Sequence, residues 1–395
     1  MAASPRFEYF LYRKERPIEE GTWNWDAPFP GKNPPAPGEP LSNDPPDVRI
    51  GDYFTGARAF LEKNRFNLLT QSASKLAGFP IAFNQIRTIR IRLQKHGEFY
   101  HPARVDVMGD GFDVAFVLNI ALSDRGAEWI EREYRLLKML TRRYPSSYLP
   151  EVFGIGSHAF YGKKVRMFLG EWMEGFHEFH HVPDRSGKGT RIEVWGEEGP
   201  PFLLSSFQEQ ELYRQISHIL TFYYDIPSFK QIYPWHHAAG DFVVRMDGGD
   251  LYVKLISVRG YAPMFRKAPS FKSAKDARSF ILHAILLFFL DLSIRIRIDR
   301  IGGVGKMIWA DETSLQGLVN GFFAGLTMKP PVNGFPAPIY DCFNAYLASC
   351  RKEDLDELLM GIANRHLPRK EESELILPRL KWHSKTLYAA IRQHL

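Results

Sequence analysis

The sequence predicts an α+β protein in which an antiparallel sheet with one helix comes first and helices dominate the C-terminal part. Two observations support this prediction. Residues 81–122 form short apolar or alternating segments separated by turn residues, as strands do. Residues 206–224 and 273–297 instead repeat apolar side chains at helical spacing.

Composition limits the class of protein. The chain has 395 residues, of which 45% are hydrophobic, enough for a large core and more than one compact unit. Lys and Arg exceed Asp and Glu by 51 − 45 = 6, a mild excess that permits anionic partners such as nucleotides without indicating nucleic acid. The two cysteines, Cys342 and Cys350, cannot staple the whole chain, which favours a reducing compartment.

The N-terminal stretch has no apolar segment of the secretory type, so we expect a cytoplasmic protein. The most apolar run, 280–292, is interrupted by His283 and Asp291. It falls short of the roughly 20 apolar residues that a bilayer span needs. We therefore expect a buried helix there and no membrane span.

The first 80 residues are expected to hold an arm and a helix. Residues 1–50 form the arm, because 28–46 is dense in Pro, Gly, Asn and Asp, a composition that favours extended chain. Trp23 and Trp25 flank that stretch and would anchor it on the body. Residues 51–78 repeat apolar side chains at helical spacing and predict a helix.

Strands follow. In 86–93 apolar side chains partly alternate with arginines, and 99–107 would return beside it as a hairpin. Residues 114–122 predict a further strand, and Ser123 is suited to cap the helix expected over 125–143. Two more strands are predicted, at 149–156 and 165–172.

The second half is expected to be mainly helical. Residues 183–199 form a Gly- and charge-rich insertion, and 206–224 an amphipathic helix. Residues 234–261 predict a loop with paired histidines and then two strands joined by the tight turn 247–250. Further helices are predicted over 273–297, from 311 or 313 to 326, and over 339–350, 352–363 and 381–395.

A hairpin, a strand, a helix with interior Glu and two strands precede the stretch Glu-Trp-Met-Glu-Gly at 171–175. This order, with the stretches LPEVFGIGS and MFLGEWMEG, resembles the N-terminal lobe and hinge of the protein-kinase-like and aminoglycoside-phosphotransferase superfamily. The resemblance covers about 81–261. It implies a two-lobed protein, with the arm over 1–50, an N-lobe and hinge over 51–175, and a mainly helical C-lobe over 176–395.

The resemblance implies ATP and Mg²⁺ as cofactors, but the residues that usually bind them are partly replaced. The third strand of that fold usually holds a Lys for the phosphates, and here the position is Asn119. The next helix should offer a Glu to pair with the Lys. Glu131 and Glu133 are available, although without the Lys they could equally be surface charges. Glu171 begins the hinge beside the expected cleft. Alternative basic groups are Arg90, Arg92 and Lys95.

The catalytic loop of the superfamily is His-Gly-Asp or His-Arg-Asp, followed five residues after the Asp by a metal-binding Asn. The stretch 236–241 can be aligned with it in two ways. If Gly-Asp matches, Asp241 is the candidate base and Met246 stands in place of the Asn. If His237 matches the family His, Ala239 stands in place of the Asp and Asp241 in place of the Asn.

The second metal ligand of the superfamily, an Asp after the next strand, is replaced by Ser257. A hydroxyl is a poor substitute for a carboxylate on Mg²⁺. The structural alternative to a catalytic role is that His236 and His237 cap or hydrogen-bond the loop. The site is therefore expected to be degenerate.

A competing motif is His177-Glu178-Phe179-His180-His181, which matches H-E-x-x-H. In that motif two histidines on one face of a helix bind zinc and the Glu acts as the base. Gly175 and Pro183 leave barely two turns for such a helix, and a third ligand would have to come from elsewhere, such as His236 or His237. The alternative to a zinc-binding helix is a polar, aromatic-rich loop.

Residues 302–306, Gly-Gly-Val-Gly-Lys, are only superficially similar to a phosphate-binding loop. Arg300 stands where that loop needs Gly, and Met307 where it needs Ser or Thr. We expect a turn between helices there. Nearby Arg295, Arg297 and Arg300 form a basic stripe, which is either a solvated face or an anion site.

Together these patterns predict a kinase-like protein with a degenerate nucleotide site, which acts as a pseudokinase-like binding or regulatory protein for a nucleotide or a protein partner. Asp241 and His237 are the candidate catalytic residues. The candidate cofactor-binding residues are Asn119, Glu133, Glu171 and Ser257. One alternative is an atypical active ATP-dependent phosphotransferase. The other is an H-E-x-x-H zinc hydrolase.

Overall fold

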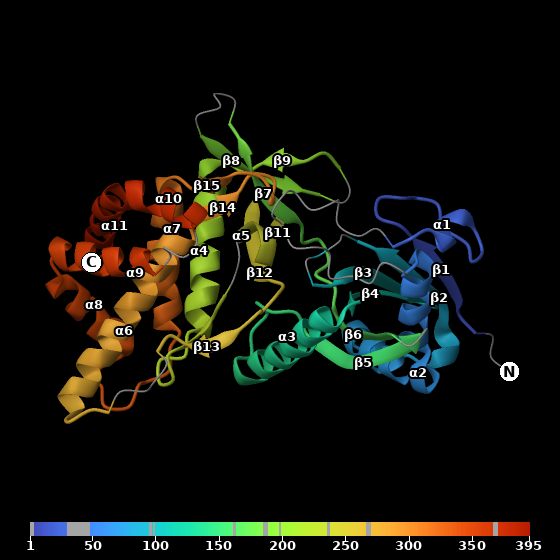
Figure 1. The fold of residues 1–395 in the computed structure, drawn as a ribbon. Helices are drawn as coiled ribbons and strands as arrows, with labels where there is room; N and C mark the ends of the chain where they lie inside the picture. The colour runs from blue at the N-terminus through green and yellow to red at the C-terminus, as the bar shows by residue number, and fades with distance from the viewer. Residues whose placement is uncertain are drawn as a thin grey trace. The chain divides into compact units, whose positions relative to one another are not determined.

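The computed structural model is an α+β protein with a mixed six-stranded sheet (Figure 1). It describes residues 4–29, 48–94, 97, 99–160, 163–184, 189–196, 199–234, 238–265, 270–365 and 370–395. The chain divides into two compact units. The first comprises Met1–Pro145 and Pro150–Glu174, and the second Ser146–Leu149 and Gly175–Leu395.

The first unit is built on the six-stranded sheet, in the order β1-β2-β3-β4-β6-β5. Neighbouring strands are antiparallel, except that β1 runs parallel to β2. The strands are β1 (Arg6–Phe10), β2 (Ile86–Leu93), β3 (His101–Gly109), β4 (Phe112–Ala121), β5 (Val152–Phe160) and β6 (Lys163–Glu171). The strands predicted between 86 and 172 are all present.

The core of the first unit lies between this sheet and α2 (Ile50–Ala77), which contacts β4 and β5. Alternating residues such as Ile89 and Ile91 of β2 are fully buried there, as the strand pattern predicts. The second helix, α3 (Asp124–Arg143), packs on β4, β5 and β6. The Ser123 hydroxyl accepts a hydrogen bond from the Gly126 amide at 3.1 Å, so the predicted cap is confirmed.

The expectation that residues 1–50 form an arm is wrong for the part that the structure describes. Residues 6–10 are a strand of the sheet, and Tyr9 and Phe10 are buried. The Tyr9 ring contacts Trp25 and Phe54 at centroid distances of 5.1 and 5.2 Å. The apolar area of this aromatic strand favours docking over extension. The Pro-rich stretch 30–47 lies outside the described residues, and a short helix, α1 (Trp23–Asp26), precedes it.

Within its described residues the second unit contains four small sheets. A three-stranded sheet joins β7 (Glu178–Pro183), β8 (Thr190–Trp195) and β9 (Phe202–Leu203). The predicted hairpin is confirmed as β11 (Phe242–Asp247) and β12 (Asp250–Leu255), with Gly248 and Gly249 at positive φ in its turn. Two further pairs are β10 (Lys230–Ile232) with β13 (Tyr261–Pro263), and β14 (Ile298–Arg300) with β15 (Met307–Trp309).

Two expectations for this unit need correction. Residues 183–199 are not simply an insertion, because 190–195 form strand β8. Residues 302–306 are not a turn between helices, because they connect β14 to β15. Gly302 and Gly303 have φ of 56° and 76°, a conformation that suits a hairpin turn.

The helices of the second unit match the predicted pattern closely. They are α4 (Ser206–Tyr223), α6 (Ala274–Arg295), α7 (Glu312–Thr327), α8 (Ile339–Ser349), α9 (Lys352–Asn364) and α11 (Leu380–His394). Short α5 (Ala238–Asp241) and α10 (Lys370–Ile376) were not predicted. Helices α4 and α7 lie side by side, and the Ser217 hydroxyl donates to the Leu318 carbonyl at 2.8 Å.

Helix α6 contains the most apolar run of the chain. Within the described residues it is the one helix whose length and composition would allow it to cross a membrane, and 50% of its most apolar 18-residue stretch is buried inside the protein. Helices in the core of soluble proteins commonly have the same length and composition. Residues such as Phe289 and Leu290 are fully buried in α6, as the sequence predicts.

Candidate functional site

Asp241 is the centre of the candidate site. It ends α5 directly before β11, and only 1% of the residue is exposed. The Ser257 hydroxyl donates to Asp241 Oδ1 at 2.7 Å, and the Arg259 guanidinium lies 3.1 Å from the same oxygen. A buried carboxylate needs such partners, because an unpaired charge is strongly disfavoured away from water. The structure therefore brings together two predicted residues, Asp241 and Ser257.

Arg259 changes what this carboxylate can do. In a metal site the carboxylate oxygens would face a cation supplied from solution. Here a guanidinium from the chain itself contributes the positive charge, and a hydroxyl contributes a hydrogen bond. The arrangement thus gives the Asp241 carboxylate a positively charged partner and a hydrogen-bond donor from within the protein.

A second buried carboxylate, Asp299, holds the same loop from β14. Its Oδ2 accepts from the Ala239 amide at 3.3 Å and its Oδ1 from the Arg300 amide at 2.7 Å. Burial raises the pKa of Asp299 from 3.8 to about 6, although these two amides lower it. The nearby Asp241 carboxylate raises the pKa of Asp299 further, and the nearby His180 lowers it. The pKa of Asp299 therefore depends on both groups.

The helix that the H-E-x-x-H hypothesis requires is not formed, because residues 178–183 are strand β7 paired with β8. His177 pairs through its backbone with Val244 of β11. The His181 ring lies 3.0 Å from the Tyr213 hydroxyl and 3.2 Å from that of Thr190. In the part of the chain that the structure describes, no group of three or more His, Cys, Asp or Glu is placed to hold a metal ion.

His180 connects β7 to the turn between β14 and β15. It is 7% exposed, its ring centroid lies 4.1 Å from that of Trp195, and its Nε2 lies 3.6 Å from a Glu178 oxygen. A Cβ on Gly303 would come within 2.9 Å of the His180 ring. The Gly302 amide donates to the His181 carbonyl at 2.9 Å. The H-E-x-x-H stretch and the Gly-rich turn 302–306 therefore lie next to each other.

The turn 302–306 does not present its amides as a phosphate-binding loop does. The amides of Gly302, Gly303 and Gly305 donate to the carbonyls of His181, Arg300 and Ile301. The interpretation of the basic stripe, Arg295, Arg297 and Arg300, as a solvated face is also wrong. Arg295 pairs with Asp291 at 3.0 Å and Arg300 with Glu371 at 2.6 Å, whereas Arg297 is buried.

The remaining predicted cofactor residues lie in the first unit. Asn119 on β4 is 9% exposed, opposite Pro102 and Phe168 on the neighbouring strands. Glu133 on α3 is 3% exposed and accepts from the Tyr100 hydroxyl at 2.7 Å, so the surface-charge alternative is wrong for this residue. Glu131 pairs with Arg166 at 3.0 Å. Glu171 ends β6 and accepts from the Glu151 amide at 3.1 Å.

The basic groups considered as a relocated Lys have partners of their own. Arg90 pairs with Glu8 at 2.7 Å. Arg92 donates to the Lys14 carbonyl at 3.0 Å and lies over the Phe10 ring. Lys95, like the candidate catalytic His237 and its neighbour His236, lies outside the described residues.

Sequence reasoning missed Arg259 and Asp299. Arg259 stands two residues after Ser257, and Asp299 is the acidic residue in the run Ile-Arg-Ile-Arg-Ile-Asp-Arg at 294–300. In each case the available signal was a charged residue in an otherwise apolar or basic run. The residue that each of the two contacts is 18 or more positions away in the chain, so the sequence pattern alone does not identify the partner.

No known protein-family model matches this chain, and no curated protein is significantly similar to it in sequence. Its function is therefore argued from the geometry of this site.

Proposed function

We propose that this chain is a kinase-like protein with a degenerate nucleotide site, which binds a nucleotide or a protein partner and transfers phosphate weakly or not at all. Support comes from the order of elements: antiparallel strands β2, β3 and β4, helix α3, strands β5 and β6, and later helix α4 with the hairpin β11–β12. The resemblance to the kinase-like superfamily rests on this order.

The observation that carries the proposal is the enclosure of Asp241. Its carboxylate is 1% exposed and already holds Ser257 and Arg259. Phosphoryl transfer relies on Mg²⁺ to neutralise charge on the phosphates, and the protein must supply carboxylate or amide oxygens for that metal. An Asp paired with an internal guanidinium is a poor metal ligand, which favours binding over transfer.

The residue at the Lys position of the superfamily also favours binding over transfer. Asn119 carries no positive charge to grip a phosphate. Arg90 and Arg92, the described basic groups considered as replacements, have other contacts. A nucleotide bound by such a site would depend little on a divalent ion.

The first test is a thermal-shift titration of the purified full chain with ATP, in Mg²⁺ and in EDTA. A ligand that binds only the folded state stabilises it by RT ln(1 + [L]/Kd), so millimolar ATP reveals weak binding. We expect equal shifts with and without Mg²⁺. A shift that requires Mg²⁺ would support the active atypical phosphotransferase instead. No shift with ATP in either condition would contradict the nucleotide site.

Replacement of Arg259 tests the role of the internal ion pair. Arg259→Gln leaves Asp241 buried without its cation and should lower the free energy of unfolding by about 3 kcal/mol. The uncovered carboxylate should then take a metal, so Mg²⁺ alone should raise the Tm of this variant but not of the wild type. Arg259→Lys keeps the charge and serves as the control. An equal response of all three proteins to Mg²⁺ would contradict the role assigned to Arg259.

A further inference from the structure

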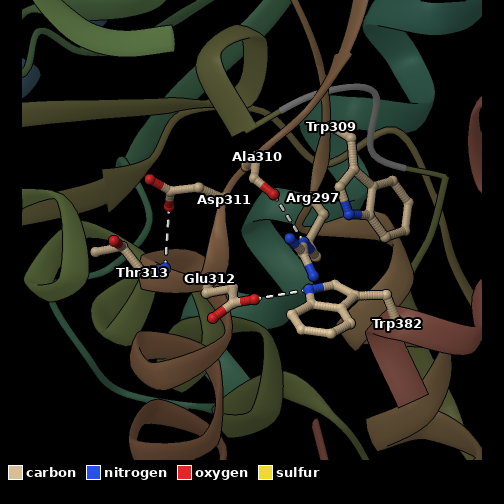
Figure 2. A pocket seen from close by; sticks show the side chains of 7 residues that line it. All are labelled: Arg297, Trp309, Ala310, Asp311, Glu312, Thr313 and Trp382. Atoms are coloured by element: carbon tan, nitrogen blue, oxygen red, sulfur yellow. Dashed lines mark hydrogen bonds between the residues drawn. The ribbon is translucent and has the colours of Figure 1, made fainter. Parts of the chain in front are cut away.

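An open pocket of about 480 Å³ lies at the N-terminus of α7 in the second unit, far along the chain from the Asp241 loop. Figure 2 shows the side chains of Trp309 and Trp382 beside the guanidinium of Arg297. Trp309 ends β15, and Trp382 lies in the first turn of α11. Asp311, Glu312 and Thr313, where α7 begins, supply further polar groups of the lining.

The indoles are held in place by contacts with neighbouring side chains. Trp382 Nε1 donates to a Glu312 carboxylate oxygen at 2.7 Å (Figure 2). Trp309 lies edge-on to the His383 ring, with centroids 5.5 Å apart. A ring fixed by such contacts loses little freedom when a ligand binds, which favours affinity. Yet Trp382 is 55% exposed, so a ligand can reach its ring.

Charge decides which ligand fits. Arg297 is buried, donates to the Ala310 carbonyl at 2.8 Å, and lies 4.9 Å from the Trp309 ring centroid. Its positive charge faces two carboxylates, those of Asp311 and Glu312, so the residues that line the pocket carry a formal charge of 1 − 2 = −1. The ammonium of Lys385, beside the Trp382 ring, balances this charge from the edge of the pocket. An added anion would meet the two carboxylates of the lining, whereas an added cation would take the place of the Lys385 ammonium, which sits on a flexible stem beside the Trp382 ring.

The kind of cation follows from the groups that surround it. A hard divalent ion needs several oxygen ligands, and the described residues hold no group of three acidic or imidazole side chains suited to a metal. Indole faces attract soft organic cations through the ring quadrupole. Both indoles already do so, since Arg297 lies over Trp309 and Lys385 lies 5.1 Å from the Trp382 ring centroid.

We propose that this pocket binds an organic ammonium group, with the Trp382 and Trp309 rings around its methyl or methylene groups and the Glu312 and Asp311 carboxylates balancing its charge. The volume of about 480 Å³ exceeds that of an ammonium head alone and leaves room for the rest of a small ligand or for a modified lysine side chain. Ammonium binding in this pocket requires no nucleotide chemistry at the Asp241 loop.

The test uses the full chain labelled with fluorotryptophan, whose eight Trp signals report on each indole. Trp309→Phe and Trp382→Phe assign the two relevant signals. The probes are choline and its neutral isostere, in which a tert-butyl group replaces the trimethylammonium head, at constant ionic strength. Choline should shift both signals, and the isostere should bind about 2- to 30-fold more weakly, the range expected for a cation–aromatic contact.

Variants separate charge from shape. Glu312→Gln keeps an oxygen that accepts from Trp382 and removes one charge, so it should weaken choline binding several-fold. The control is Glu353→Gln, a carboxylate in the first turn of α9 that does not line the pocket, and it should bind choline as the wild type does.

Three results would overturn the proposal. Equal binding of choline and its isostere would mean that the pocket is merely apolar. Shifts of the two signals by acetate or phosphate, with none by choline, would make Arg297 the centre of an anion site. No shift with choline at about 0.1 M would exclude a useful ammonium site, because its Kd would then lie far above the millimolar range.

Discussion

Asp299 is a carboxyl group that folding transfers from water into a site where 2% of the residue is exposed. Burial raises its pKa to about 6. Between pH 4 and 6 the folded state therefore binds more protons than the unfolded state, and this group's contribution to stability falls as pH rises. Well above pH 6 the Asp299 carboxylate is charged in both the folded and the unfolded state. The contribution of this group to stability then no longer changes with pH.

Asp299→Asn should remove this pH dependence. Because the shift is about two pKa units, the free energy of unfolding of the variant relative to wild type should increase by up to about 3 kcal/mol between pH 4 and pH 7. Urea unfolding at both pH values measures this difference. Taking the difference is necessary, because burial lowers the pKa of His383 to about 3, so acid destabilises the fold through that residue.

Asp247→Asn, in the exposed turn of the β11–β12 hairpin, is the matched control and should show no such change. If Asp299→Asn differs from wild type by the same amount at both pH values, Asp299 is not buried in the manner described.

At the residue scale the sequence predicted Asp241 and Ser257 as neighbours, and the structure joins them by a hydrogen bond. That prediction came from the resemblance to the kinase-like superfamily, in which both positions belong to one site, and not from a local pattern. Asp299 contacts the same loop at Ala239 from 60 positions away. Periodicity and turn chemistry contain no information on such a pairing, because only tertiary packing creates it.

Among the elements, the contact of α4 with α7 depends on three glycines spaced four residues apart, Gly317, Gly321 and Gly325. A Cβ at Gly317 or Gly321 would overlap the carbonyl oxygen of Gln210 or Arg214 on α4, and one at Gly325 would lie 2.7 Å from the Thr221 Cβ. The absence of side chains on this face of α7 allows the two helix backbones to approach closely.

Gly321→Ala should therefore destabilise the protein. An added methyl against backbone costs about 1–3 kcal/mol, which exceeds the roughly 1 kcal/mol that Ala contributes through helix propensity. Gly361→Ala on α9 is the control, because nothing lies within 4 Å of its added Cβ, and it should stabilise. Denaturant unfolding measures both. Stabilisation of the Gly321 variant would show that α4 and α7 are not in close contact.

Helices and long strands were predictable because their patterns are local. The predicted bounds of α3, α4, α6 and α9 lie within about two residues of the observed ones. The failures have other causes. Strands β14 and β15 have three residues each, too few to show an alternation. The stretch 177–181 fits a helix motif by its letters, but β8 supplies a partner strand that decides its conformation.

For the molecule as a whole, the N-terminal segment is part of the first unit's core, although its sequence suggests an arm. Tyr9 is 5% exposed and Tyr12, three residues later, is 46% exposed. Composition over 1–50 averages a docked strand with the Pro-rich stretch 28–46, and so conceals the difference between them.

Tyr9→Ala should lower the free energy of unfolding by about 3–5 kcal/mol, as the loss of a buried aromatic side chain does. Tyr12→Ala, the control, should change it by no more than about 0.5 kcal/mol. Thermal or urea unfolding measures both. Equal effects of the two substitutions would show that β1 is not part of the core in solution.

The pairing of β1 with β2 has a consequence for the newborn chain. Arg6 is opposite Thr88 in the sheet, 88 − 6 = 82 positions later. At about 5–20 residues per second of translation, β2 is synthesised roughly 4–16 s after the aromatic strand β1. During that interval β1 is an aromatic strand without its partner, so its burial in the sheet can begin only after β2 has been synthesised.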